Sequence, residues 1–174
     1  INGYGDGRYG PADRTGKGAF TLMVCRLFNL PQQTGENFVD VAADSPYAKE
    51  ILTAKVLGIA DGVAKKEDPG SQQNREEKSE TQVEPEKNHF YPESAITREQ
   101  AIVMLVRAMK IQAGSPALLS AYNDGDKVSA DARSAMASMI QMGIITGDTE
   151  GKLNPGNSIT RAEIAVILHK VLTM

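Results

Sequence analysis

The sequence ITRAE at residues 159–163, near the C-terminus, is nearly repeated as ITREQ at residues 96–100. A weaker third version, TGKGA, occupies residues 15–19. Each version begins four residues after a proline and leads into an apolar run that is long enough for a helix. Three copies of one element in 174 residues predict a single architecture built from repeats.

Apolar residues recur every three or four positions after each copy, which is typical of an amphipathic helix. The spacing predicts long helices over about residues 17–29, 98–110 and 161–172. Because these helices can bury their apolar faces only against one another and against shorter helices, we expect an all-α fold. It would have pseudo-threefold character, a central three-helix bundle, Gly-rich loops and little or no sheet.

Each complete repeat has a first half, made of a shorter helix, and a second half, made of a Gly-rich loop and the long helix. The loop at residues 3–11 aligns without gaps to residues 147–155, and both end in proline. Gly58 and Gly143 stand where a helix C-cap glycine is expected. The predicted units are therefore a half-repeat at 1–31, a second repeat at 38–111 and a third at 119–174. Residues 65–87 are rich in Glu, Lys, Gln and Ser, and we expect a flexible surface insertion there.

Composition excludes several classes of function. A net charge of -3 gives no basic face for nucleic acid, and no apolar stretch is long enough to cross a membrane. No nucleophile, zinc or phosphate-loop motif is present, so we expect no enzyme activity, no cofactor and no metal. The single cysteine, Cys25, is interpreted as a core residue. Because the chain begins at Ile1 without a signal peptide, we expect a processed protein or an excised fragment.

A cation occupies the first turn of each long helix: Lys17, Arg98 or Arg161. This is the unfavourable charge for the positive end of a helix dipole. A capping box accounts for the Thr and the Glu or Gln on either side, but it does not account for the cation. A bound anion that meets free backbone amides and the side-chain charge is one explanation. An internal ion pair is the other, and for Lys17 the two are evenly balanced.

Several motifs in fixed order resemble the S-layer homology (SLH) domain family over nearly the whole chain. They are Phe-x-Asp at 38–40, Gly-Ile-x-x-Gly at 58–62 and 143–147, the aromatic-x-Pro step at 90–92, and ITRAE. Copy two ends in Gln100 rather than Glu, and copy one keeps only its charge. The resemblance implies three repeats in a three-pronged helical trimer. It also implies a secreted module at the Gram-positive cell surface that binds pyruvylated secondary cell-wall polysaccharide non-covalently.

In that family the basic residue contacts the pyruvate carboxylate, and the matching positions here are Arg161, Arg98 and, less closely, Lys17. Asp40 and Asp124 are either turn carboxylates or ligands for sugar hydroxyls. The predicted binding residues are Arg161, Arg98, Lys17, Thr160, Thr97, Glu163, Gln100, Asp40, Asp124, Gly3, Gly62 and Gly147.

The alternative function is a protein–protein interaction or S-layer assembly module that binds no glycan. The incomplete first copy predicts an exposed apolar seam on the first long helix. We expect upstream residues or a second chain to cover that seam, so self-association is a further possible partner interaction.

Overall fold

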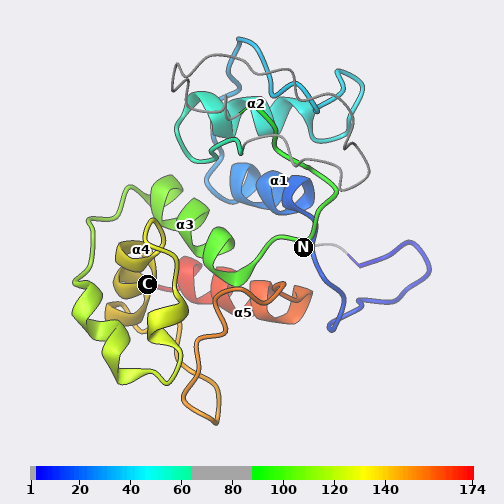
Figure 1. Ribbon diagram of the computed structural model, residues 1–174. Helices are drawn as coiled ribbons and strands as arrows, with labels where there is room; N and C mark the ends of the chain where they lie inside the picture. The colour runs from blue at the N-terminus through cyan, green and yellow to red at the C-terminus, as the bar shows by residue number, and fades with distance from the viewer. Residues whose placement is uncertain (1–2, 64–87) are drawn as a thin grey trace, which may run out of the picture.

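The computed structural model describes residues 3–63 and 88–174, and within them the chain is helical without a strand (Figure 1). The all-α prediction is confirmed, while the predicted insertion at 65–87 lies outside the described residues. The long helices are α1 (Lys17–Leu27), α3 (Arg98–Met109) and α5 (Arg161–Leu172), and the short helices are α2 (Ala48–Val56) and α4 (Arg133–Gln141). Two 3-10 helices, η1 (Pro116–Ala121) and η2 (Gly125–Lys127), precede α4.

The three long helices begin at a closed ring of backbone hydrogen bonds. The amide of Thr15 donates to the carbonyl of Ile159 over 3.3 Å, and the amide of Ile159 donates to Ile96 over 3.1 Å. The amide of Ile96 then donates to Thr15 over 2.9 Å, which closes the cycle. Equivalent residues of the three copies thus meet in cyclic order. The central bundle expected beyond this ring stays a prediction.

Each short helix packs on the long helix that precedes it in the chain. In Figure 1, α2 lies over α1 and α4 lies beside α3. Gly58 and Gly143 end the short helices with φ of +68° and +69°. After them, the amide of Ile59 donates to Ala54 over 2.8 Å and that of Ile144 donates to Met139 over 3.0 Å. These are Schellman caps, so the glycine prediction is confirmed.

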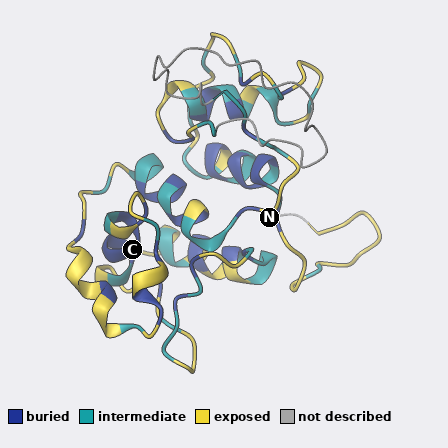
Figure 2. Cartoon of the chain, viewed as in Figure 1, coloured by how far each residue is buried: buried dark blue, intermediate teal, exposed yellow. Residues whose placement is uncertain are grey.

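The core follows the apolar positions of the helices. Figure 2 shows buried residues on the inward faces of α1, α3 and α4, and exposed residues along η1. Cys25 is buried in α1, where its thiol lies 3.5 Å from the carbonyl of Glu50. Burial, with a smaller contribution from the charge of Glu50, raises the pKa of this thiol to about 11. Cys25 therefore serves as a core residue, as its position indicated.

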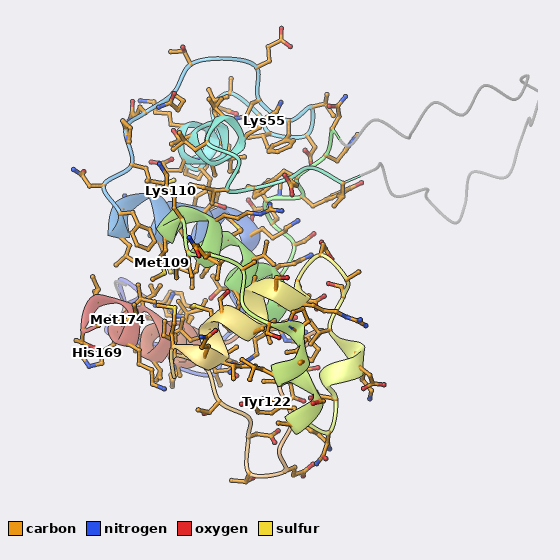
Figure 3. The ribbon with its side chains drawn as sticks, turned by 90° about the vertical axis from the view of Figure 1, so that its left-hand side faces the viewer. Lys55, Met109, Lys110, Tyr122, His169 and Met174 are labelled. Carbon is orange, nitrogen blue, oxygen red and sulfur yellow. The ribbon has the colours of Figure 1, made fainter. Side chains whose placement is uncertain are left out.

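The exposed seam lies on α5 and not on α1, which corrects the expectation from sequence. Because a short helix covers the preceding long helix, α1 is covered by α2. Cys25 of α1 and Val106 of α3 are buried, but the equivalent residue of α5, His169, is exposed. Figure 3 shows His169 at the outer edge of the molecule. Nearby, Val166 is 56% exposed and Leu172 is 66% exposed.

Gly18 of α1 allows Tyr47 to pack closely, and we predict that Gly18→Ala destabilises the protein. An added Cβ would stand 2.5 Å from the Tyr47 ring. Helix propensity alone would favour alanine by about 1 kcal/mol, but overpacking costs about 1–3 kcal/mol. We expect a net loss of about 1 kcal/mol in urea denaturation. In a Tyr47→Ala background, Gly18→Ala should become neutral or stabilising. The same loss in both backgrounds would contradict the steric explanation.

Candidate functional site

The first two amides of each long helix donate to carbonyl groups of another repeat. In α3, the amide of Arg98 donates to Asn157 over 2.8 Å and that of Glu99 donates to Pro155 over 3.0 Å. The first amides of α1 donate in the same way to Ser94 and Pro92, and those of α5 to Asp13 and Pro11. The expectation that an anion would meet free amides at these helix starts is therefore wrong. Carbonyl oxygens already surround the positive end of each dipole.

The third amide of α3 and of α5 is held by a capping box, as the sequence predicted. The hydroxyl of Thr97 accepts from the amide of Gln100, and that of Thr160 accepts from the amide of Glu163, each over 3.3 Å. The side chains of Gln100 and Glu163 reach back to the cap amides. Gly16 caps α1 without any side-chain hydrogen bond. Each threonine therefore caps the start of its helix, and this role requires no ligand.

Two of the three predicted cations are held by the loop of another repeat. Lys17 is 9% exposed, donates to the carbonyl of Phe90 over 3.1 Å and lies 5.0 Å from the centre of its ring. The Nε of Arg161 donates to the equivalent carbonyl, that of Tyr9, over 2.9 Å. Its guanidinium carbon lies 4.9 Å from the ring centre of Tyr4 and 5.1 Å from that of Tyr9. Carbonyl and aromatic contacts thus balance both charges.

Arg98 is held differently, because Leu153 takes the place that an aromatic residue has in the other two loops. Its Nη1 donates to Oε1 of Glu163 over 3.1 Å, while its Nε is buried without a hydrogen-bond partner. The side chain of Arg98 is 14% exposed and that of Glu163 is 44% exposed. The guanidinium therefore retains one donor that the described protein groups do not use, beside a carboxylate that water can reach.

Arg98 lines a groove of about 360 Å³ between α5 and the Gly-rich loop of the third repeat. Its charged lining consists of three cations and two carboxylates: Arg98, Lys152, Lys170, Asp148 and Glu163. Backbone and side-chain hydrogen bonds, first that from the amide of Lys152, hold the pKa of Asp148 below its usual range, so it stays ionised. We call this groove the Arg98 groove. Its balance of charge is positive, which suits an anionic ligand.

The equivalent groove of the second repeat has the opposite balance. It measures about 440 Å³ and includes Lys17, Gly62 and Gln100 from the predicted set. Its ionisable lining consists of two cations and three carboxylates: Lys17, Arg107, Asp61, Glu99 and Asp131. Arg107 is paired with Asp61 over 2.6 Å. We call this the Lys17 groove. Its cations are both engaged by protein groups, so it is a poorer site for an anion.

Asp40 and Asp124 accept backbone hydrogen bonds from the loop that precedes each proline. Asp124 is buried, and its oxygens accept from the amides of Leu153 and Asn154 over 2.7 and 2.8 Å. Asp40 accepts from Phe90 and Tyr91 over 2.8 and 2.6 Å. Among these four amide donors, Tyr91 and Asn154 have φ of +56° and +53°. These contacts support the turn-carboxylate interpretation and show how the loop is kept in place.

The predicted glycines have close neighbours within the protein. A Cβ on Gly147 would stand 2.9 Å from the ring of Tyr122, and one on Gly3 would stand 2.9 Å from the carbonyl oxygen of Arg8. Gly147 also lines the Arg98 groove. Asp148 and Lys170, which line the same groove, were not among the predicted residues. Nor was Lys152, although its alignment with Arg8 marks a basic position in the loop.

Within the described residues, no cluster of His, Cys, Asp or Glu could hold a metal ion. None of the described helices has the length and apolar character that a membrane span requires.

Comparison with known proteins gives one matching family. Residues 121–165 match the S-layer homology domain. The whole chain is similar to three larger proteins. It is 29% identical to an amylopullulanase of Thermoanaerobacterium thermosulfurigenes and 26% identical to the surface-layer 125 kDa protein of Lysinibacillus sphaericus, over 99% of the chain in both cases. It is 27% identical to S-layer protein EA1 of Bacillus anthracis over 95% of the chain. The chain covers 8%, 13% and 16% of these three proteins.

We predict that Asp124→Ala destabilises the fold, because two buried amides lose a charged acceptor. Hydrogen bonds to charged groups contribute about 1.5–3 kcal/mol each, so we expect a loss of about 3 kcal/mol in urea denaturation. Asp124→Asn is the matched control. The asparagine side chain keeps one acceptor oxygen, so the free energy of unfolding should fall by roughly half as much. A stable Asp124→Ala protein with weaker glycan binding would instead assign Asp124 to the ligand.

Proposed function

From the S-layer homology domain at residues 121–165, we propose that this chain attaches a secreted surface protein to the bacterial cell wall. Cell-wall attachment is the general role of this domain family, and similarity to two S-layer proteins supports a cell-surface location. The finer proposal is that the ligand is pyruvylated secondary cell-wall polysaccharide, bound without a covalent bond. The matched region is a small share of the amylopullulanase, which supports an attachment module separate from catalysis.

The Arg98 groove is the observation that carries the glycan proposal. It combines a guanidinium that Glu163 engages through Nη1 alone, two lysines and an accessible cleft. A pyruvyl carboxylate can accept two parallel hydrogen bonds from a guanidinium, and such charge-assisted pairs are among the strongest in proteins. The ionised Asp148 can accept hydrogen bonds from sugar hydroxyl groups in the same groove. This arrangement fits an acidic sugar better than a neutral one.

The three cations are proposed to bind unequally. Lys17 and Arg161 already contact a carbonyl group and at least one aromatic ring. A ligand at either position must therefore replace a carbonyl and aromatic contacts, whereas at Arg98 it must replace only one hydrogen bond to the partly exposed Glu163. Arg98 is the principal anchor in this proposal, and Lys17 and Arg161 contribute less. The other predicted binding residues, apart from Glu163, are also proposed to contribute less than Arg98.

The decisive variant is Arg98→Ala. Loss of a charge-assisted, two-donor contact is worth about 2 kcal/mol, so we expect about 30-fold weaker binding to purified pyruvylated polysaccharide. Because Glu163 is partly exposed, its ion pair with Arg98 contributes less than about 1 kcal/mol to stability. The melting temperature of the Arg98→Ala variant should therefore change little. Titration calorimetry and thermal unfolding measure the two effects.

Arg161→Ala is the matched control for Arg98→Ala. Because its guanidinium contacts Tyr4 and Tyr9, we expect a larger loss of stability and a smaller loss of affinity. Polysaccharide from which the pyruvyl groups have been removed provides the ligand control. Equal binding of the two polysaccharides would reject the proposal, and so would unchanged binding by Arg98→Ala.

The exposed face of α5 favours a second candidate function, association with another protein. The equivalent faces of α1 and α3 each receive a short helix, α2 or α4, from the same chain. On α5 the residue equivalent to the buried Cys25 and Val106 is the exposed His169, and Leu172, further along the helix, is 66% exposed. A short amphipathic helix of the α2 type is therefore the partner that the face fits, whether it comes from another copy or from another protein.

We predict that the chain associates through α5 if such a helix is available from a second copy. Sedimentation should then show dimers whose fraction increases with protein concentration. Leu172→Asp should shift the protein to monomer, because it places a charge on the apolar face. Leu118→Asp is the control, since Leu118 is 38% exposed on η1, away from α5. A monomer at all concentrations would reject self-association. The second candidate function would then require a different protein as the partner of α5.

A further inference from the structure

We infer that Glu163 is an internal competitor for the anionic ligand and sets the affinity of the Arg98 groove. This inference rests on the proposed function, because it concerns the ligand of the same groove. The carboxylate of Glu163 occupies the position at Arg98 that a ligand carboxylate would take. An acidic sugar must therefore displace Glu163 from the guanidinium before it can form its own pair.

The two oxygens of Glu163 have separate partners. Oε2 accepts from the amide and from the hydroxyl of Thr160, each over 2.8 Å, and this contact completes the helix cap. Oε1 accepts from Nη1 of Arg98 over 3.1 Å. A ligand can thus replace Oε1 at the guanidinium without breaking the capping contacts of Oε2. The groove can open to its ligand while α5 keeps its first turn.

The pair between Arg98 and Glu163 is also incomplete. A carboxylate facing a guanidinium can take two parallel N–H donors, but Glu163 takes one. A ligand carboxylate that is not tied to a helix cap can turn to meet the two terminal nitrogens, Nη1 and Nη2, together. The ligand therefore has a geometric advantage over Glu163 at the same cation.

The charge of Glu163 is not required for capping. In α3, the neutral Gln100 occupies the equivalent position and forms the same capping box through its amide oxygen, which accepts from Thr97 over 3.1 Å. Gln100 lines the Lys17 groove, where the cation is Lys17 and contacts the carbonyl of Phe90 instead. Two contacts of Glu163 have no counterpart at Gln100: the hydrogen bond from the hydroxyl of Thr160 and the pair with Arg98.

The test is Glu163→Gln, measured by titration with purified pyruvylated polysaccharide. We expect binding about fivefold tighter, the order of effect expected when one partly exposed ion pair is released. The melting temperature should stay close to that of the unchanged protein, because glutamine keeps the cap. Glu36→Gln is the matched control. It removes one exposed carboxylate that lines neither groove, so it should not change the affinity.

Glu163→Gln binding that is unchanged or weaker overturns the inference. If Arg98→Ala still weakens binding about 30-fold in that case, the proposed function stands and only the competitor role of Glu163 fails. If the unchanged protein does not bind the pyruvylated polysaccharide, both fail together.

A second measurement does not depend on the stability of the variant. On titration of the unchanged protein, the Nε–H resonance of Arg98 should shift as the guanidinium exchanges Glu163 for the ligand. The side-chain carboxyl carbon of Glu163 should shift as it loses Arg98. A shift at Arg98 without one at Glu163 rejects competition.

Discussion

The exchange of backbone hydrogen bonds between repeats is the interaction on which the rest of the structure depends. Thr15, Ile96 and Ile159 form a closed ring, and six further carbonyl groups take the first two amides of the three long helices. Buried backbone amides left without partners are costly, so each helix start is stable only when the loop of another repeat stands beside it. The helices and the Gly-rich loops are therefore positioned by the same set of bonds.

This exchange also decides where the grooves form. The cation at the start of one long helix points to the loop of another repeat, so each groove combines a cation and a loop from different copies. Arg98, from the second copy, thus faces the Gly-rich loop of the third, where Asp124 holds the amides of Leu153 and Asn154. Asp124 acts on the groove through the loop that forms its wall. A residue in the first half of a repeat can therefore affect a cation from the copy before it.

Local patterns in the sequence predicted those parts of the fold that local forces determine. Apolar spacing gave the long helices, and the capping boxes and the glycines at 58 and 143 lie where they were expected. The carbonyl partners of the helix amides could not be predicted, because they lie 56 or more residues away in the sequence. The seam was assigned to α1 because each short helix was assumed to cover the long helix of its own copy. In the structure it covers the preceding one, which leaves α5 exposed.

The candidate site shows how a nearly symmetric frame can hold unequal grooves. The same helix position carries Lys17, Arg98 and Arg161, and the backbone around all three is bonded in the same way. What differs is the residue that faces the cation. Phe90 and Tyr9 offer a carbonyl group and a ring, whereas Leu153 offers no ring, and Arg98 turns to Glu163 instead. Because the frame is built from backbone groups, these side chains can change without loss of the ring. The charge at a helix start can therefore contribute to structure in two copies and remain available to a ligand in the third.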